Sequence, residues 1–270
     1  MREDELKKQS AIPEVPRLGR SDSFRFCCNP SLVCFMHCCQ DVSIILTPYD
    51  VLRLKRTLRL DSTEFLAQCT ISAFTRQEKT PIVMLKMDPE SRKCPFVTPE
   101  GCRVHASRPW ACRMYPLGLA DPERPTASEP RFYFLVREDF CQGHAGWQEL
   151  TVSEWLTEQG VEQYEMMGAA FKDLMLHPFW RSDQSLSPQQ ARMCFMALYD
   201  LDRFRRFIFE SSFLERFEVD EARVEALRTD DVELLDFGTQ WLRFSLFREK
   251  ALKIRSSFRE NKMQPVSPGE

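Results

Sequence analysis

The chain of 270 residues lacks the features that mark a membrane, exported or nucleic-acid-binding protein. No apolar run approaches the ~20 residues that a helix needs to cross a bilayer. Residues 1–10 are charged and carry no apolar signal core, so we expect neither export through such a signal nor membrane association. The formal net charge is −3 and the two signs are interleaved, which gives no broad basic face for nucleic acid. We therefore expect a cytoplasmic protein with no nucleic-acid partner.

Common catalytic motifs are also missing. The sequence has no glycine-rich phosphate loop, no His-Glu-x-x-His and no nucleophile elbow. It shows no internal repeat of convincing period. The absence of these motifs does not decide whether the protein is an enzyme.

What the sequence has in quantity is cysteine, with eleven in total and all but one before Trp147. In a reducing compartment, clustered thiols more often bind metal than form disulfides. Cys27-Cys28 and Cys38-Cys39 are adjacent pairs, whose Cα atoms lie about 3.8 Å apart. A disulfide prefers roughly 4.4–6.8 Å, so neither pair is expected to close on itself. A hydrophobic fraction of 43% can form a core without disulfides.

The spacing of these cysteines predicts a metal site made of thiolates. The first cluster has the pattern Cys28-x5-Cys34-x3-Cys38-Cys39, which brings several donors from one loop. Thiolates suit zinc, or iron, including a 4Fe-4S cluster, and eight thiols can hold two metals or one cluster with spares. Buried, inert thiols are the alternative. The predicted ligands are Cys28, Cys34, Cys38, Cys39, Cys94, Cys102, Cys112 and Cys141.

Three other cysteines are assigned differently. Cys27 competes with Cys28 for the first ligand position, and we favour Cys28 because its spacing leads into the cluster. Cys69 and Cys194 lie in apolar helical stretches and are predicted to be buried free thiols.

Histidine is scarce, and three of the four histidines neighbour a candidate ligand. His37, His105 and His144 are possible zinc ligands, but a role in orienting the ligands, or at the surface, is simpler where cysteine is in surplus. His177 precedes a proline at a predicted helix end, so we expect it to cap or to be structural.

Two arginines flank Cys112. Arg108 and Arg113 could donate hydrogen bonds to sulfur and offset the negative charge of thiolates. They could instead form ordinary surface ion pairs. Both interpretations stay open from the sequence.

Local signals before residue 150 predict short elements. Thr47 and Asp61 are each expected to cap a helix, and residues 81–87 and 131–137 are predicted strands. A turn over residues 98–101 would make a hairpin that brings Cys94 and Cys102 near each other. Ser107 is expected to cap a short helix that Pro116 ends.

Helix signals dominate from Thr151 onward. Helices are predicted over residues 151–160, 161–176, 202–217 and 230–254, with another beginning at Ser187. The fold class is therefore α+β and mainly helical, with a small metal-organised N-terminal region of short strands followed by a helical C-terminal region. The predicted divisions are a disordered tail over 1–20, a cysteine-cluster metal-binding domain over 21–150, a helical region over 151–260 and a disordered tail over 261–270.

The chain resembles the YkgJ-type cysteine-cluster family of zinc- or iron-chelating proteins over about residues 24–145. The residues that carry the resemblance are Cys38-Cys39, Leu46-Thr47-Pro48 with Asp50, Cys94-Pro95-Phe96, Gly101-Cys102, Arg108-Pro109 and Cys112-Arg113-Met114-Tyr115-Pro116. The compact form of the family spaces its first cysteines more tightly than this chain does. Relatives of that family include flagellin lysine methylases, so the resemblance also implies an enzyme as an alternative.

Three hypotheses follow for the function. The first is a metal-binding protein with zinc or iron as its partner and cofactor. The second is an iron–sulfur-dependent redox or protein-modifying enzyme related to the flagellin lysine methylases. The third is an adaptor that docks an unknown protein partner on the aromatic C-terminal helices. It predicts an exposed aromatic patch, and burial of Phe237, Trp241 and Phe244 together would remove its basis. Packing of these aromatic side chains in a helical core is the simpler interpretation.

Overall fold

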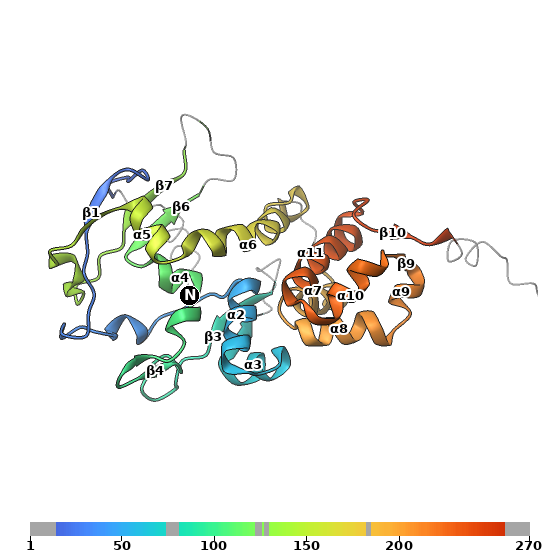
Figure 1. Ribbon diagram of the computed structural model, residues 1–270, viewed down its shortest axis with the longest axis horizontal. Coiled ribbons are helices and arrows are strands. Elements are labelled where there is room, and N and C mark those ends of the chain that lie inside the picture. The colour runs from blue at the N-terminus through green and yellow to red at the C-terminus, as the bar shows by residue number, and fades with distance from the viewer. Residues whose placement is uncertain (1–14, 74–80, 122–125, 127–129, 182–184, 257–270) are drawn as a thin grey trace, which may run out of the picture. The chain divides into compact units, whose positions relative to one another are not determined.

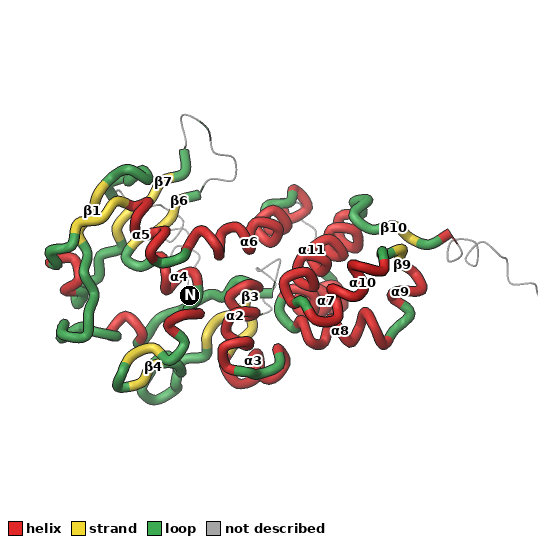
Figure 2. The backbone as a smooth tube through the Cα atoms, in the orientation of Figure 1, coloured by secondary structure: helices red, strands yellow, loops and turns green. Residues whose placement is uncertain are grey.

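The computed structural model describes residues 15–73, 81–121, 126, 130–181 and 185–256. The predicted tail over 261–270 lies outside the described residues, and so does most of the tail over 1–20. Within the described residues the fold is α+β and mainly helical, as predicted, with short antiparallel strand pairs toward the N-terminus and helices toward the C-terminus (Figure 2). In that same part of the chain, every helix is too short or too polar to span a bilayer.

The chain forms two compact units, and each unit is built from two stretches that are separate in sequence. Unit 1 consists of Met1–Ile44 and Met87–Glu165, and unit 2 of Ile45–Lys86 and Met166–Glu270. Each unit is described by itself below.

Unit 1 contains paired short strands and several short helices (Figure 1). Strand β1 pairs with β8, β4 with β5, and β6 with β7, all antiparallel. The strands are β1 (Ser23–Arg25), β4 (Val97–Thr98), β5 (Gly101–Cys102), β6 (Leu117–Ala120), β7 (Phe132–Leu135) and β8 (Glu149–Thr151). The helices are η1 (His37–Cys39), η2 (His105–Ser107), α4 (Trp110–Met114), η3 (Gln142–Ala145), α5 (Val152–Glu158) and the first residues of α6 (Val161–Met175).

The core of unit 1 forms around β1. Phe24 lies opposite Leu150 in the β1–β8 pair, which brings residue 24 next to a strand more than a hundred positions later. Phe26 is 2% exposed and packs edge-on against Trp155, with ring centroids 5.5 Å apart. Phe26 therefore anchors the start of the cysteine-rich loop in an apolar core, which fixes where that loop leaves the fold.

Unit 2 consists of helices and two small strand pairs. Helix α11 packs on α7, α8 and α10, α7 also packs on α8, and α3 packs on α2 and α8. The helices are α2 (Pro48–Leu58), α3 (Ser62–Cys69), the remainder of α6, η4 (Pro178–Arg181), α7 (Pro188–Leu198), α8 (Leu201–Glu210), α9 (Phe213–Arg216), α10 (Glu221–Thr229) and α11 (Asp231–Phe247). The strands are β2 (Thr70–Ala73), β3 (Ile82–Leu85), β9 (Phe217–Glu218) and β10 (Lys253–Ile254).

Capping boxes are present at the starts of three helices that the sequence predicts, α2, α3 and α5. The Thr47 side chain accepts the Asp50 N–H at 3.1 Å, and the Asp50 carboxylate accepts the Thr47 N–H at 2.7 Å. Asp61 and Thr151 make the same reciprocal pattern at the starts of α3 and α5. These three predicted helix starts are confirmed because each depends only on residues within one turn.

Two of the predicted helix ranges are wrong. The helix expected over 202–217 is broken after Glu210, because the Ser211 hydroxyl donates to the Phe207 carbonyl at 2.6 Å and accepts the Phe213 N–H at 3.2 Å. The helix expected over 230–254 ends at Phe247, where Arg248 adopts a left-handed conformation with φ 60°.

The prediction that Ser107 caps the helix carrying Cys112 is also wrong. Ser107 ends the preceding turn η2, and α4 begins at Trp110 after Pro109, without a side-chain cap. Proline 109 has φ −56° and ψ 157°, so its extended backbone separates the turn from the helix.

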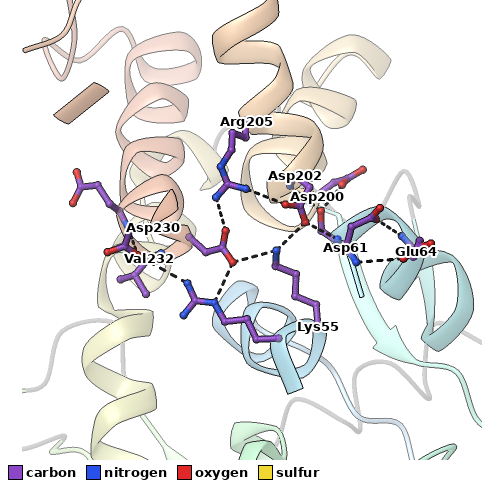
Figure 3. Close-up of polar contacts among 12 residues, drawn as sticks. Lys55, Asp61, Glu64, Asp200, Asp202, Arg205, Asp230 and Val232 are labelled. Atoms are coloured by element: carbon purple, nitrogen blue, oxygen red, sulfur yellow. Dashed lines mark hydrogen bonds and ion pairs between the residues drawn. The ribbon is translucent and has the colours of Figure 1, made fainter. Parts of the chain in front are cut away.

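A buried ionic cluster joins α2, α3, α8 and α11 inside unit 2 (Figure 3). The Lys55 ammonium lies 2.8 Å from the Asp202 carboxylate and 3.1 Å from that of Asp231, and its side chain is only 7% exposed. Arg205 pairs with both carboxylates, and the Ser62 N–H donates to Asp202 at 2.7 Å. Burial opposes ionisation, but the bonds from these cations and donors lower the pKa of Asp202 and of Asp231.

The aromatic side chains of α11 belong largely to the core of unit 2. Phe237 and Trp241 are 0% and 7% exposed, and Phe244 is half-buried. Phe244 packs edge-on against Phe217, with ring centroids 5.4 Å apart.

Candidate metal centre

All eleven cysteines lie in the described residues and are free thiols. Unit 1 contains nine of them, including all eight predicted ligands. Cys69 and Cys194 belong to unit 2 and are 7% and 2% exposed, as expected for apolar helical positions. Burial raises the pKa of the Cys194 thiol to about 12, so it stays protonated and unreactive near neutral pH.

The cysteine-rich loop is held at its start by backbone contacts with residues 143–148. The Phe26 N–H donates to the Gln148 carbonyl at 3.0 Å, and the Cys27 N–H donates to the Gly143 carbonyl at 2.9 Å. A Cβ at Gly146 would lie 2.5 Å from the Cys27 Cβ, which only glycine avoids. The loop thus runs directly against the backbone that follows Cys141.

The middle of the loop meets the same segment through sulfur. The Cys34 Sγ accepts the Gln142 N–H, with 3.3 Å between nitrogen and sulfur. Cys141 is fixed in turn by its own N–H, which donates to the Glu138 carbonyl at 2.8 Å. The loop and the segment that carries Cys141 are therefore joined through a sulfur atom.

The end of the loop pairs with the segment before the β4–β5 hairpin. The Cys94 N–H donates to the Cys39 carbonyl at 2.8 Å, Gln40 forms an antiparallel bridge with Lys93, and the Asp41 N–H donates to the Arg92 carbonyl at 2.9 Å. The predicted hairpin is confirmed, and Cys102 lies opposite Val97 in it. The Val97 N–H donates to the Cys94 carbonyl at 3.2 Å, which holds both arms of the hairpin near Cys39.

These contacts bring the predicted ligands close enough to interact electrostatically. The Cys28 thiol interacts with those of Cys38, Cys141, Cys34 and Cys27, and the Cys39 thiol with those of Cys38, Cys94 and Cys112. Arg108 interacts with Cys112, Cys102 and Cys28. All eight predicted ligands therefore converge in unit 1, from segments that are far apart in sequence.

The environment changes the acidity of individual thiols. Although Cys28 is an exposed residue, desolvation of its thiol, followed by the neighbouring thiols, raises its pKa to about 11. A hydrogen bond from Cys39 lowers the pKa of Cys38 to about 7, against partial burial, with Arg108 contributing. The same bond raises the pKa of Cys39, since that thiol is the donor. The pair thus favours one thiolate within the cluster at neutral pH.

Two buried polar atoms beside the thiols are left without partners. The Arg108 Nε and the Tyr115 hydroxyl make no hydrogen bond of normal geometry, although the Tyr115 hydroxyl lies against the Cys141 thiol. Burial, and then that contact, raise the pKa of Tyr115, so it is a donor. Buried donors without partners are costly, and the sulfur atoms of a metal-bound thiolate would accept from them.

The donor set therefore suits a thiolate-bound metal in its chemistry. Among the residues that the structure describes, however, no three histidine, cysteine, aspartate or glutamate side chains form a ready-made group around one point. The thiols lie near one another, but their sulfur atoms do not surround a common point at which an ion could bind.

The arginines flanking Cys112 have different roles. Arg113 donates to three backbone carbonyls, those of Arg108 at 3.0 Å, Gln159 at 2.5 Å and Ala106 at 2.7 Å, and stacks on the Tyr164 ring at 4.6 Å. Neither interpretation offered from the sequence describes Arg113, which holds the backbone around α4. Arg108 bonds to Gln159 through one terminal nitrogen and leaves its Nε toward the buried interior, where its charge interacts with thiols.

The histidines beside cysteines lie mostly in structural contacts. The His37 ring lies against Phe140, with centroids 4.5 Å apart. Burial, then Arg108 and Arg113, lower the pKa of His105. His144 Nε2 lies 3.1 Å from the Val136 carbonyl oxygen, and burial lowers the pKa of this ring as well. In unit 2, His177 caps η4, because its Nδ1 accepts the Phe179 N–H at 3.1 Å.

Comparison with known families identifies the cysteine-bearing stretch. Residues 27–142 match the sequence pattern of the CxxCxxCC family, described as a "putative zinc- or iron-chelating domain". The stretch is therefore similar to that domain over somewhat less than half of the chain. The match begins at Cys27 and extends one residue beyond Cys141, so it contains all eight predicted ligands and agrees with the YkgJ-type resemblance. No curated protein and no solved structure gives a significant match.

The family name describes a tighter spacing than this chain has. Two residues separate each of its first cysteines, whereas five separate Cys28 from Cys34 and three separate Cys34 from Cys38. The longer gaps accommodate the Asn29–Ser31 turn, in which the Asn29 side chain accepts the Ser31 N–H at 3.0 Å.

Proposed function

We propose that the cysteines of unit 1 bind zinc or iron through thiolates, and that the bound metal holds this unit together. The observation that carries the proposal is the convergence of thiols from four separate segments, which contain Cys28 to Cys39, Cys94 to Cys102, Cys112 and Cys141. Unit 1 has only short strands and short helices, so cross-links between its segments would contribute much of its stability.

The proposed ligands are the eight cysteines predicted from spacing. Rotation about a Cα–Cβ bond moves a cysteine sulfur between staggered positions, so thiols that already share a neighbourhood can turn toward an ion. Arg108 would offset the negative charge of several thiolates, and its unpartnered Nε would donate to one of them. We further propose the cytoplasm as the compartment, because its reducing conditions keep such thiols available.

Metal content of protein purified without oxygen tests this proposal. We expect zinc or iron in at least equimolar amount with the chain, retained through gel filtration. Protein that folds and carries no stoichiometric metal after purification without chelators would contradict the proposal.

An iron–sulfur centre is the second candidate, favoured by the buried Arg108 Nε and Tyr115 hydroxyl beside the thiols. Hydrogen bonds to cluster sulfurs tune reduction potentials, so such donors suit a redox cluster. A brown anaerobic preparation with broad visible absorbance would favour this candidate, and a colourless zinc-loaded one would count against it. The prediction of a redox or protein-modifying enzyme depends on finding such an iron–sulfur centre.

The adaptor receives less weight because Phe237 and Trp241, two of the three aromatic side chains on which it depends, are buried in unit 2.

A further inference from the structure

The thiols of unit 1 separate into two groups when their backbone contacts are followed. The first group lies where the cysteine-rich loop meets residues 141–143. Cys34 accepts the Gln142 N–H at 3.3 Å, and the Cys27 N–H donates to the Gly143 carbonyl at 2.9 Å. Cys28 lies close enough to interact electrostatically with Cys38, Cys141 and Cys34, and with its neighbour Cys27. This group is Cys28, Cys34, Cys38 and Cys141.

The second group lies where the end of the same loop meets the β4–β5 hairpin and α4. The Cys39 carbonyl accepts the Cys94 N–H at 2.8 Å, and the hairpin brings Cys102 back opposite Val97. Cys39 interacts with Cys94 and Cys112, and also with its neighbour Cys38. This group is Cys39, Cys94, Cys102 and Cys112.

The division falls between the adjacent residues Cys38 and Cys39. Both belong to the 3-10 turn η1, in which consecutive residues are about a third of a turn apart. Their thiols still share a hydrogen bond, so the two groups are neighbours. An adjacent pair is the simplest way for one loop to supply a sulfur atom to each of two sites.

Arg108 interacts with both groups. Its charge acts on Cys112 and Cys102 of the second group and on Cys28 of the first. Two all-thiolate sites side by side would repel each other strongly, and the half-buried guanidinium of Arg108 beside both reduces that repulsion. The number of sulfur atoms agrees, because each group has the four donors of a closed tetrahedral zinc site.

We propose that unit 1 holds two neighbouring four-sulfur metal centres, one on Cys28, Cys34, Cys38 and Cys141 and the other on Cys39, Cys94, Cys102 and Cys112. The inference rests on the proposed metal-binding function and adds to it the number of centres and the assignment of each thiol. It also gives the long spacers of the first cluster a role, since the loop must reach two sites instead of one.

Native mass spectrometry of the full chain, reduced and titrated with zinc without oxygen, tests the inference. We expect two zinc ions per chain at saturation. One ion per chain would overturn the two-centre arrangement while leaving the proposed function intact. No bound ion would contradict the proposed function itself, so the two failures are distinguishable.

Single substitutions test which thiols belong together. In the presence of a chelator that leaves the wild type with two zinc ions, Cys34→Ser and Cys94→Ser are each expected to retain one, and the double variant none. Cys194→Ser, in unit 2, is the matched control and should retain two. Loss of both ions from a single variant would overturn the assignment. If a variant does not fold, the wild-type stoichiometry still decides between one centre and two.

Discussion

The Cys34 sulfur accepts a hydrogen bond from the backbone N–H of Gln142, although 108 positions separate the two residues in the sequence. The bond joins the first cysteine cluster to the last predicted ligand, Cys141, through the residue that follows it. It places the two ends of the matched stretch, residues 27–142, next to each other, which is the condition for thiols from both ends to share one centre.

Replacing Cys38 tests the ligand assignment within the loop. Cys38→Ser is expected to lower the metal content per chain by at least one ion and to lower the thermal stability of unit 1, because it removes a proposed ligand whose pKa is lowered to about 7. Elemental analysis and a thermal melt provide the measurements. Cys194→Ser should keep the wild-type metal content, and equal metal content in the two variants would show that the assignment is wrong.

Replacing Arg108 tests its electrostatic role. Arg108→Met keeps an apolar stem of similar length and removes the charge that acts on Cys112, Cys102 and Cys28. We expect zinc affinity to fall roughly 10–100-fold, the usual effect of losing a group that supports metal ligands. Competition with a coloured chelator measures it.

Arg25→Gln is the control for that experiment. Arg25 is 69% exposed and pairs with Glu149 at 3.5 Å on β8, without a thiol among its contacts. Its zinc affinity should match the wild type. An equal loss of affinity in both variants would indicate a general charge effect and contradict the role given to Arg108.

Removing the metal should loosen one part of the chain and not the other. With chelator and reductant, we expect faster hydrogen exchange in residues 26–41, 94–112 and 138–146, because metal binding contributes folding free energy there. Helices α8 and α11 should keep their protection, since large apolar side chains such as Phe204 and Phe237 are fully buried there. Uniform loss of protection over both units would contradict this account.

The buried ionic cluster of unit 2 predicts that a single substitution strongly lowers the free energy of unfolding. Lys55→Met leaves the Asp202 and Asp231 carboxylates with one cation fewer in a mostly buried position, so we expect unfolding to become easier by about 3–5 kcal/mol. The matched control, Lys253→Met, breaks an exposed pair with Glu218 and should change the free energy of unfolding far less. Chemical denaturation of both variants measures the difference.

The same cluster predicts the direction of acid sensitivity. The pKa values of Asp202 and Asp231 are lowered in the folded state, so their contribution is complete above the unfolded value of about 4. It is lost as the pH falls through the lower folded values. Stability in the wild type should therefore fall below about pH 4 more steeply than in Lys55→Met, where the carboxylates ionise less readily.

Some elements could be predicted because residues close to them in the sequence determine their structure. The capping pairs Thr47 with Asp50 and Asp61 with Glu64 each lie within one turn, and the hairpin turn at Gly101 needs the positive φ of 133° that the structure gives it. The density of cysteine is also visible in the sequence alone, and residues 27–142 match a family described as a "putative zinc- or iron-chelating domain".

Other features could not be read from local patterns. The pairing of Phe24 with Leu150 and the contact of Cys34 with Gln142 join residues that no short motif connects. Arg113 beside a cysteine suggested charge compensation, but the nearby carbonyls of Ala106, Arg108 and Gln159 take its donors. A charged group can be predicted from sequence, while its partner depends on the packing around it.

The metal's own ligand shell is the most direct test of the account. X-ray absorption at the zinc or iron edge of anaerobically purified protein should show about four sulfur neighbours per metal, at roughly 2.3 Å for zinc. A shell made mainly of nitrogen or oxygen would contradict the central claim that thiolates of unit 1 hold the metal.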